Sequence, residues 1–186
     1  GVRPETGDRF VLVDPVDGTK EFIHRRGEFT VNIALIEDGR PVAGAVAAPA
    51  RGVVWYGGER AWRAPIDQGA VQQAEARVIQ VRRKTPGAIT AVMSRSHADE
   101  KTRAFAETEG VTETISAGSS LKFCLVADGE ADLYPRFGPT MEWDTAAGHA
   151  VLAAAGGSVE TPDGAAFLYG KREAGYRNGG FIARGG

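Results

Sequence analysis

The stretch Phe10-Val11-Leu12-Val13-Asp14-Pro15-Val16-Asp17-Gly18-Thr19 joins a short apolar run to a turn that carries two carboxylates. The apolar run predicts a buried strand that ends at Asp14. Pro15 fixes one backbone dihedral between the carboxylates, and Gly18 lets the chain turn tightly. Such a rigid turn can aim both carboxylates and the Val16 carbonyl at one point. Because hard oxygen ligands suit Mg²⁺, the turn predicts a magnesium site.

A purely structural interpretation of this turn stays open. Asp-Pro and Asp-Gly dipeptides are common in Asx turns, which need no metal. Thr19 is placed to cap a helix that follows the turn, and free N–H groups at the start of such a helix favour phosphate.

A second feature with chemical content is Trp143-Asp144-Thr145-Ala146-Ala147-Gly148. Asp144 is the expected N-cap of an alanine-rich helix, and capping alone would explain it. Small side chains leave the first turn of that helix almost bare, so a ligand or another backbone can come close. The helix dipole would also favour a phosphate there.

The hydrophobic pattern divides the chain near residue 85. Residues 10–63 predict an antiparallel meander, because apolar and polar residues alternate in short runs separated by turn residues. Its later strands are predicted at residues 29–35, 42–48, 52–56 and 60–63. The second half alternates strands with helices and predicts an α/β layer. Its strands are expected at residues 89–93, 112–116, 131–134 and, as the final strand, 158–161, and its helices at residues 98–109, 119–127 and 145–155. The expected domains are therefore residues 1–84, an α+β unit with the antiparallel sheet, and residues 85–186, an α/β unit.

Composition indicates an ordinary globular protein and excludes several classes. The 186 residues carry 22 Lys and Arg against 24 Asp and Glu, so no nucleic-acid polymer is expected as a partner. The basic triplet Arg82-Arg83-Lys84 is interpreted as a solvated strand end or linker. The one cysteine, Cys124, lies in an apolar helical pattern and is expected to be a buried small hydrophobe. No apolar run reaches the roughly 18 residues of a transmembrane segment.

Taken together, the two aspartate motifs resemble the signature pair of the inositol monophosphatase superfamily, which are Mg²⁺-dependent, lithium-sensitive phosphomonoesterases. Five further stretches are similar to the bacterial CysQ branch of that superfamily, the 3'(2'),5'-bisphosphate nucleotidases. They cover residues 17–23, 27–36, 94–99, 118–127 and 134–140. The resemblance runs from about residue 10 to at least residue 168. It implies the layered αβαβα sugar-phosphatase fold, with two or three Mg²⁺ ions as cofactors.

The resemblance also implies a role for each matching residue. Asp14 would bridge two metals, while the Val16 carbonyl and Asp17 would bind one metal each. Asp144 would complete the second metal and touch the substrate, and Thr19 would orient the attacking water. The residues placed around the substrate are Val16, Asp17, Gly18, Thr19, His97, Gly118, Ser119, Lys122, Arg136 and Asp144.

The implied substrate is a small nucleotide bisphosphate, adenosine 3',5'-bisphosphate, with 3'-phosphoadenylyl sulfate as a second substrate. Lys122 and Arg136 are cations that suit a second phosphate. An inositol or sugar-phosphate monophosphatase is the alternative, and it would need no second cationic site. Structural roles also stay open, with residues 94–97 as a helix entrance, Arg136 as a surface arginine and residues 118–120 as a helix cap. His24 and His149 are interpreted as surface or packing residues.

One part of the superfamily pattern is missing. The superfamily also uses a glutamate from a Glu-Glu motif that precedes the Asp-Pro turn, whereas only 13 residues precede Asp14 here. The helices that carry this motif, and that cover one face of the sheet, are therefore expected to be absent. The simplest explanation is a truncated, cleaved or partly ordered copy of a longer enzyme. A catalytically impaired fragment that still binds nucleotide is the alternative. A cytoplasmic location is expected, and the resemblance adds peripheral association with the inner membrane.

Overall fold

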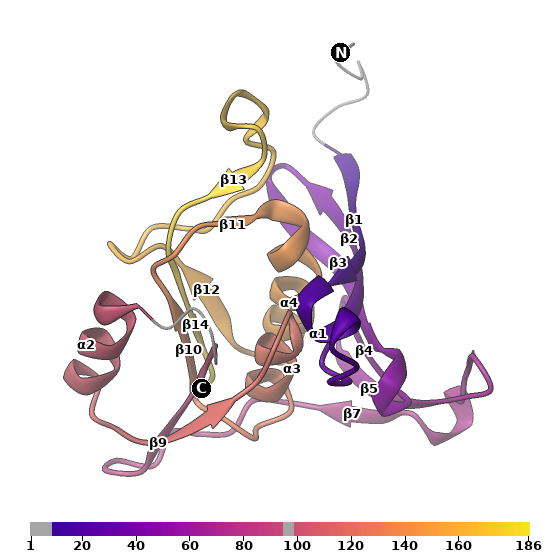
Figure 1. Ribbon diagram of the computed structural model, residues 1–186, viewed down its shortest axis with the longest axis horizontal. Helices are drawn as coiled ribbons and strands as arrows, with labels where there is room; N and C mark the ends of the chain where they lie inside the picture. The colour runs from indigo at the N-terminus through magenta and orange to yellow at the C-terminus, as the bar shows by residue number, and fades with distance from the viewer. Residues whose placement is uncertain (1–8, 95–98) are drawn as a thin grey trace.

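The computed structural model describes residues 9–94 and 99–186 of the chain. Figure 1 shows two sheets with helices α3 (Leu121–Ala127) and α4 (Glu142–Ala154) between them, and with α2 (Glu100–Thr108) on the far side of the smaller sheet. The layers therefore run sheet, helices, sheet, helix, which matches the expected layered α/β fold. Within the described residues, no helix combines the length and the apolar character needed to cross a bilayer.

The larger sheet has seven strands, and its ladders are antiparallel throughout. They are β1 (Arg9–Asp17), β2 (Thr30–Glu37), β3 (Arg40–Ala48), β4 (Val53–Gly57), β5 (Ala61–Asp67), β6 (Ala70–Val71) and β7 (Arg77–Ile79). Neighbours follow chain order from β1 to β6, and β7 pairs with β5. This confirms the meander. The β2–β3 turn has Asp38 and Gly39 at φ 50° and 73°, the left-handed pair that a tight hairpin needs.

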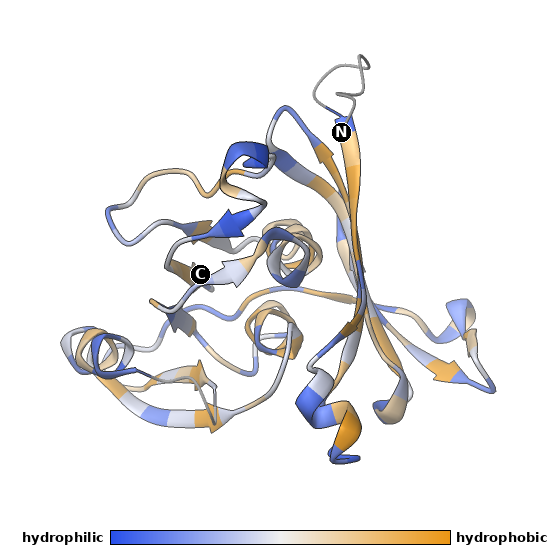
Figure 2. Ribbon diagram, turned by 45° about the horizontal axis from the view of Figure 1, so that its top comes forward, coloured by the Kyte–Doolittle hydropathy of each residue, from blue (hydrophilic) through white to orange (hydrophobic). Residues whose placement is uncertain are grey.

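Strand β1 corrects two sequence-based expectations. It continues past Asp14 to Asp17, with an irregularity in its pairing to β2 between those two residues. It is also buried on one face only, since Leu12 is 8% exposed whereas Val11 and Val13 are 56% and 51% exposed. Successive side chains of a strand point to opposite faces, so Leu12 meets the core while Val11 and Val13 face away from it. Figure 2 shows that hydrophobic residues predominate along this strand.

Close packing between layers explains the small residues of α4. A Cβ on Gly44 of β3 would lie 2.8 Å from the Ala147 carbonyl oxygen, and a Cβ on Gly148 would lie 2.5 Å from the Phe123 ring. The bare first half of α4 therefore lets the β3 backbone and the α3 side chains come close. Cys124 on α3 is fully buried, as expected.

The smaller sheet has five strands in the order β12-β14-β10-β8-β9. They are β8 (Ile89–Met93), β9 (Val111–Ser116), β10 (Leu133–Arg136), β12 (Ser158–Glu160) and β14 (Phe181–Arg184). Strand β8 runs parallel to β9 and β10, whereas β14 is antiparallel to β10 and β12. The prediction that residues 158–161 form the final strand is therefore wrong, because β14 follows and lies inside the sheet.

Two predictions about the region around residue 85 have different outcomes. The basic triplet is not simply solvated, because Arg82 forms two hydrogen bonds of 2.8 and 2.6 Å with the buried carboxylate of Asp132. The hydrophobic core contains residues from both halves, such as Val46 and Phe123. The division at residue 84 stays a prediction.

His149 of α4 has the packing role expected of it. Its Nδ1 lies 3.1 Å from the Tyr169 hydroxyl, and its ring packs against Phe167 and Tyr169. Burial lowers the pKa of His149 to about 4, with a smaller contribution from Arg40. His24, in contrast, is exposed.

Replacing His149 with phenylalanine is expected to make the protein less sensitive to acid. In the unfolded chain His149 binds a proton near pH 6.5, whereas in the folded protein it does so near pH 4. The unfolded state therefore binds this proton first, and His149 alone should lower the free energy of unfolding by about 2 kcal/mol between pH 7 and pH 5. Urea unfolding at both pH values measures this fall. The fall should shrink in His149→Phe and persist in the matched His24→Gln variant; an equal fall in all three proteins would contradict the assignment.

Candidate active site

Three carboxylates from distant parts of the sequence meet at one point. Asp14 and Asp17 lie at the end of β1, and Asp144 lies in the first turn of α4. One carboxylate oxygen from each lies within 4.8 Å of the other two. The structure therefore brings together all three aspartates that the sequence singled out.

Asp17 is held by three donors that converge on one of its oxygens. Its Oδ2 accepts from the Ser120 N–H at 2.6 Å, the Thr30 hydroxyl at 3.3 Å and the Asn32 amide at 3.4 Å. Ser120, Thr30 and Asn32 are themselves buried, and their side chains are hydrogen-bonded to one another. Within the described residues the three donors leave Oδ1 for another ligand. Burial raises the pKa of Asp17, and the nearby Lys122 opposes this rise.

The turn between the two carboxylates has Asx geometry, as its structural interpretation predicts, since Asp14 Oδ1 accepts from the Val16 N–H at 3.0 Å. Gly18 has φ 83°, and a Cβ there would lie 3.3 Å from both a Glu21 oxygen and the Ser119 Cβ. The expected cap is wrong, because Gly18 precedes helix α1 (Thr19–Ile23) and Thr19 is its first residue. The Thr19 hydroxyl instead lies 3.5 Å from the Val16 carbonyl oxygen.

Asp144 is not the N-cap of α4, which corrects a second capping prediction. The helix begins two residues earlier, at Glu142, and Met141 is the N-cap. The Asp144 carboxylate reaches back and accepts from the Met141 N–H at 2.8 Å. Burial raises the pKa of Asp144 to about 6, and the negative charges of Asp17 and Asp14 add to the rise.

This cluster fits a divalent cation. Three carboxylates face one another in a partly buried site, where mutual repulsion and loss of water make ionisation costly. A divalent cation would offset both costs, and carboxylate oxygens are the ligands that Mg²⁺ prefers. The donor chemistry therefore supports the predicted cofactor class, whereas the identity and number of ions stay predictions.

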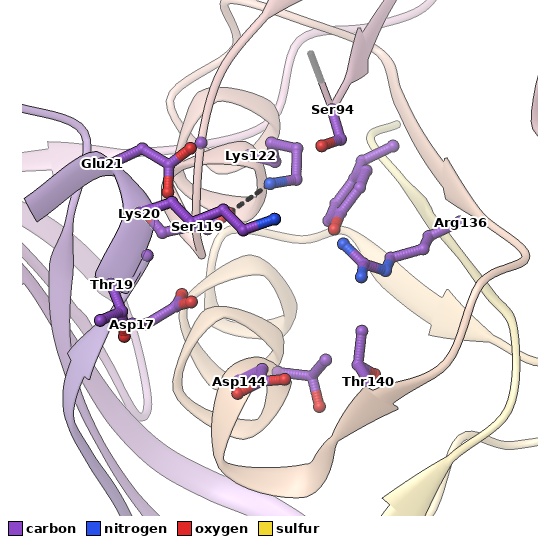
Figure 3. A pocket seen from close by; sticks show the side chains of 14 residues that line it. Asp17, Thr19, Lys20, Glu21, Ser94, Ser119, Lys122, Arg136, Thr140 and Asp144 are labelled. Atoms are coloured by element: carbon purple, nitrogen blue, oxygen red, sulfur yellow. Dashed lines mark hydrogen bonds between the residues drawn. The ribbon is translucent and has the colours of Figure 1, made fainter. Parts of the chain in front are cut away.

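The cluster opens onto a pocket with a volume of about 270 Å³ (Figure 3). The residues that line it are Asp17, Gly18, Thr19, Lys20, Glu21, Ser94, Gly118, Ser119, Lys122, Tyr134, Arg136, Thr140, Asp144 and Thr145. Figure 3 shows the carboxylates of Asp17 and Asp144 on one part of the wall, with Lys122 and Arg136 on another. The pocket thus has an acidic end at Asp17 and Asp144 and two cations at Lys122 and Arg136, while Lys20 and Glu21 add one charge of each sign to its wall.

The two cations of the pocket are held differently. Lys122 is buried on α3, and its Nζ donates to the Ser119 carbonyl at 2.6 Å. Burial lowers the pKa of Lys122 to about 8, and Asp17 partly opposes this. Arg136, at the end of β10, donates from one terminal nitrogen to the Pro139 carbonyl at 3.3 Å. Its Nε is buried and has no hydrogen-bond partner among the described residues.

Most of the predicted substrate residues lie on this pocket. Gly18, Thr19, Gly118, Ser119, Lys122 and Arg136 line it together with Asp17 and Asp144. His97 lies outside the described residues. Sequence reasoning missed the further lining residues Lys20, Glu21, Ser94, Tyr134, Thr140 and Thr145. All six lie within the stretches quoted above, so their place inside a motif was the available signal.

Comparison with known proteins gives a consistent result. The sequence profile described as the inositol monophosphatase family matches residues 2–184. A relative from Salmonella typhimurium, named 3'(2'),5'-bisphosphate nucleotidase CysQ, is 52% identical over 174 residues, which cover 93% of this chain and 67% of the relative. The relative of the same name from Buchnera aphidicola is 43% identical, over 92% of this chain and 63% of its own length. The chain thus spans about two thirds of the length of these relatives.

Solved structures agree with the sequence relatives. The crystal structure of CysQ from Bacteroides thetaiotaomicron, a bacterial member of the same family, matches with a TM-score of 0.85 and 40% identity. The match covers 96% of this chain and 70% of that one. An inositol monophosphatase from Anabaena matches with a TM-score of 0.77 at 24% identity, covering 100% of this chain and 70% of that one. The Anabaena match supports the fold alone.

Proposed function

This chain belongs to the inositol monophosphatase family, and we propose that it is a Mg²⁺-dependent phosphomonoesterase that removes the 3'-phosphate of adenosine 3',5'-bisphosphate. The products would be AMP and inorganic phosphate, and 3'-phosphoadenylyl sulfate would be a second substrate. Such a reaction belongs to nucleotide recycling in sulfur assimilation. The names of the bacterial relatives at 43% and 52% identity support this choice.

The observation that carries the proposal is the pair of cations that shares a pocket with the carboxylate cluster. Lys122 and Arg136 line the same pocket as Asp17 and Asp144. The buried Nε of Arg136 lacks a partner among the described residues, so it is a donor in need of an acceptor. The Arg136 side chain lines the pocket, and a guanidinium can hold a second phosphate there through two parallel hydrogen bonds.

The residues of the acidic end would have separate tasks. Asp14, Asp17, Asp144 and the Val16 carbonyl would hold the metal, and when bound Mg²⁺ would activate a water and neutralise charge on the leaving oxygen. The Thr19 hydroxyl, exposed at the first residue of α1, would orient the attacking water. Asp144 would also contact the substrate phosphate.

Phosphate release from four substrates tests the proposal. The substrates are adenosine 3',5'-bisphosphate, 3'-phosphoadenylyl sulfate, AMP and inositol phosphate, each with and without Mg²⁺. We expect release to require Mg²⁺ and to favour the two substrates with a 3'-phosphate. Preference for inositol phosphate would support the monophosphatase alternative. Nucleotide binding without release at saturating Mg²⁺ would support the impaired fragment instead.

Lithium at millimolar concentration is expected to inhibit phosphate release at limiting Mg²⁺. This expectation rests on the family alone. The measurement is a Li⁺ titration of the rate, with Na⁺ at equal ionic strength as the control. A rate that responds to both ions alike would contradict the expected lithium sensitivity.

A further inference from the structure

The segment that carries Asp144 is held by the carboxyl-terminal part of the chain. Strand β11 (Thr140–Met141) pairs with β13 (Arg177–Asn178), and the next backbone N–H, that of Glu142, donates to the Tyr176 carbonyl at 2.9 Å. Figure 1 shows β13 beside β11, the strand that leads directly into α4. The backbone that delivers Asp144 to the pocket is thus tied to residues 168–178, which we call the clasp.

The side chain of Glu142 reinforces this tie. It is fully buried at the start of α4, and its carboxylate accepts from the backbone N–H groups of Gly170 at 2.8 Å and Lys171 at 2.9 Å. The same carboxylate lies 3.3 Å from the Lys171 ammonium. Glu142 therefore fastens the clasp to α4 two residues before Asp144.

Lys171 is the centre of the clasp. Besides Glu142, its Nζ donates to the Leu168 carbonyl and to Asn178 Oδ1, the latter at 3.1 Å. It also lies over the rings of Phe167 and Tyr169, 5.2 and 5.5 Å from their centroids. These contacts fix the ammonium from several sides, although it does not line the pocket.

Asn178 connects this centre to the pocket wall. Its Nδ2 donates to the hydroxyls of Thr140 at 3.3 Å and Thr145 at 3.0 Å. Both threonines line the pocket, on either side of Asp144 in the sequence. A continuous set of polar contacts therefore runs from Glu142 through Lys171 and Asn178 to the residues that flank Asp144.

We propose that Lys171 is a positioning residue that holds the Asp144 carboxylate in register with Asp14 and Asp17, a role that rests on the proposed function. Asp144 is tied to the Met141 N–H at 2.8 Å, so a shift of residues 140–142 would move its carboxylate. The three carboxylate oxygens lie within 4.8 Å of one another, and such a shift would change these distances. Partners behind a metal ligand typically change metal affinity or activity by 10- to 100-fold when removed.

The competing explanation is that the Glu142–Lys171 pair only stabilises the fold. The Asp132–Arg82 pair makes a matched control, because the two pairs have nearly the same exposure. Lys171 and Glu142 are 35% and 0% exposed, and Arg82 and Asp132 are 39% and 1% exposed. Arg82 lies outside the pocket. Lys171→Met and Arg82→Met each remove one cation from a buried carboxylate, but only the first should affect Asp144.

The test measures Mn²⁺ binding by calorimetry without substrate, together with kcat and KM for phosphate release. In Lys171→Met we expect Mn²⁺ affinity to fall by about 10-fold or more and kcat to fall with it. KM for the nucleotide should change little, and Lys171→Arg should recover part of the loss. Arg82→Met should keep wild-type Mn²⁺ affinity even if its melting temperature falls equally.

Equal Mn²⁺ affinity in wild type and Lys171→Met would overturn the positioning role. If Lys171→Met does not fold, Asn178→Ser serves instead, because it breaks the contacts to Thr140 and Thr145 while it keeps the ion pair. A wild-type Mn²⁺ affinity in Asn178→Ser would then overturn the role. Mn²⁺ binding is measured without substrate, so its outcome does not depend on which substrate the enzyme uses. A wrong substrate assignment would appear only when the wild-type protein is tested with the four substrates.

Discussion

Phosphate release by the Asp17→Asn variant is expected to be slower by about 10³-fold or more at any Mg²⁺ concentration. A bound metal contributes several kcal/mol to stabilising the charge of a phosphoryl-transfer transition state, and each 1.36 kcal/mol is about tenfold in rate. Asparagine keeps the shape of aspartate and can still accept from the Ser120 N–H. It removes, however, the negative charge that a hard cation needs.

The fold of Asp17→Asn should survive, because an ionised Asp17 carboxylate destabilises the folded protein when no cation is bound. Burial and the charge of Asp14 raise the pKa of Asp17, so its ionised form is disfavoured there. Loss of that charge should leave the melting temperature equal to or above that of the wild type.

The matched control for this variant is Asp38→Asn, at an exposed hairpin position with φ 50° that asparagine accepts well. A Mg²⁺ titration of phosphate release at saturating substrate compares both variants with wild type. Near-normal turnover in Asp17→Asn would remove Asp17 from the metal site, whereas loss in both variants would indicate a general defect.

Much of the fold follows from local sequence patterns. Alternation of apolar and polar residues identifies β2, and the turn at Asp38 and Gly39 fixes its pairing with β3. Helices α3 and α4 are apolar runs ended by glycines. Such features depend on neighbours within a few residues, so a single sequence contains the information needed to predict them.

The missed strands depend on partners far away in the chain. Strand β14 has only four residues between pairs of glycines, too few for a period, yet it lies between β12 and β10. Strand β7 lies in a polar segment and is recruited by pairing with β5. Propensity alone cannot identify such strands, because their hydrogen-bond partners decide their structure.

The candidate site also contains residues that local sequence patterns predict and residues that they do not. The carboxylates of Asp14, Asp17 and Asp144 could be predicted because rigid turns and a helix start surround them. Their supports could not, since Ser120 reaches Asp17 across 103 positions of the sequence. The clasp around Lys171 could not be predicted from the sequence either, because a lone lysine in a polar stretch resembles a surface residue.

Replacement of Arg136 by alanine is expected to damage use of adenosine 3',5'-bisphosphate far more than use of a monophosphate. The carboxylate end of the pocket, with its cation, would neutralise the phosphate that is attacked. The second phosphate would have no metal and would depend on donors such as Arg136 at the other end. One lost charge-assisted hydrogen bond costs roughly 1.5–3 kcal/mol, or about 10- to 150-fold in kcat/KM.

The hydrogen bonding of Arg136 supports this expectation, because its Nε is a donor with no partner among the described residues. The guanidinium therefore has hydrogen-bonding capacity left for a phosphate that draws it into the pocket. AMP or inositol phosphate, each with one phosphate at the acidic end, never makes this contact. The measured quantity is the ratio of kcat/KM for the bisphosphate to kcat/KM for the monophosphate, in wild type, Arg136→Ala and the exposed control Arg60→Ala, which lies outside the pocket and the clasp. The ratio should fall in Arg136→Ala alone. If both substrates lose equally, Arg136 supports the β10 end of the pocket rather than a second phosphate, and the monophosphatase alternative becomes the better account of the site.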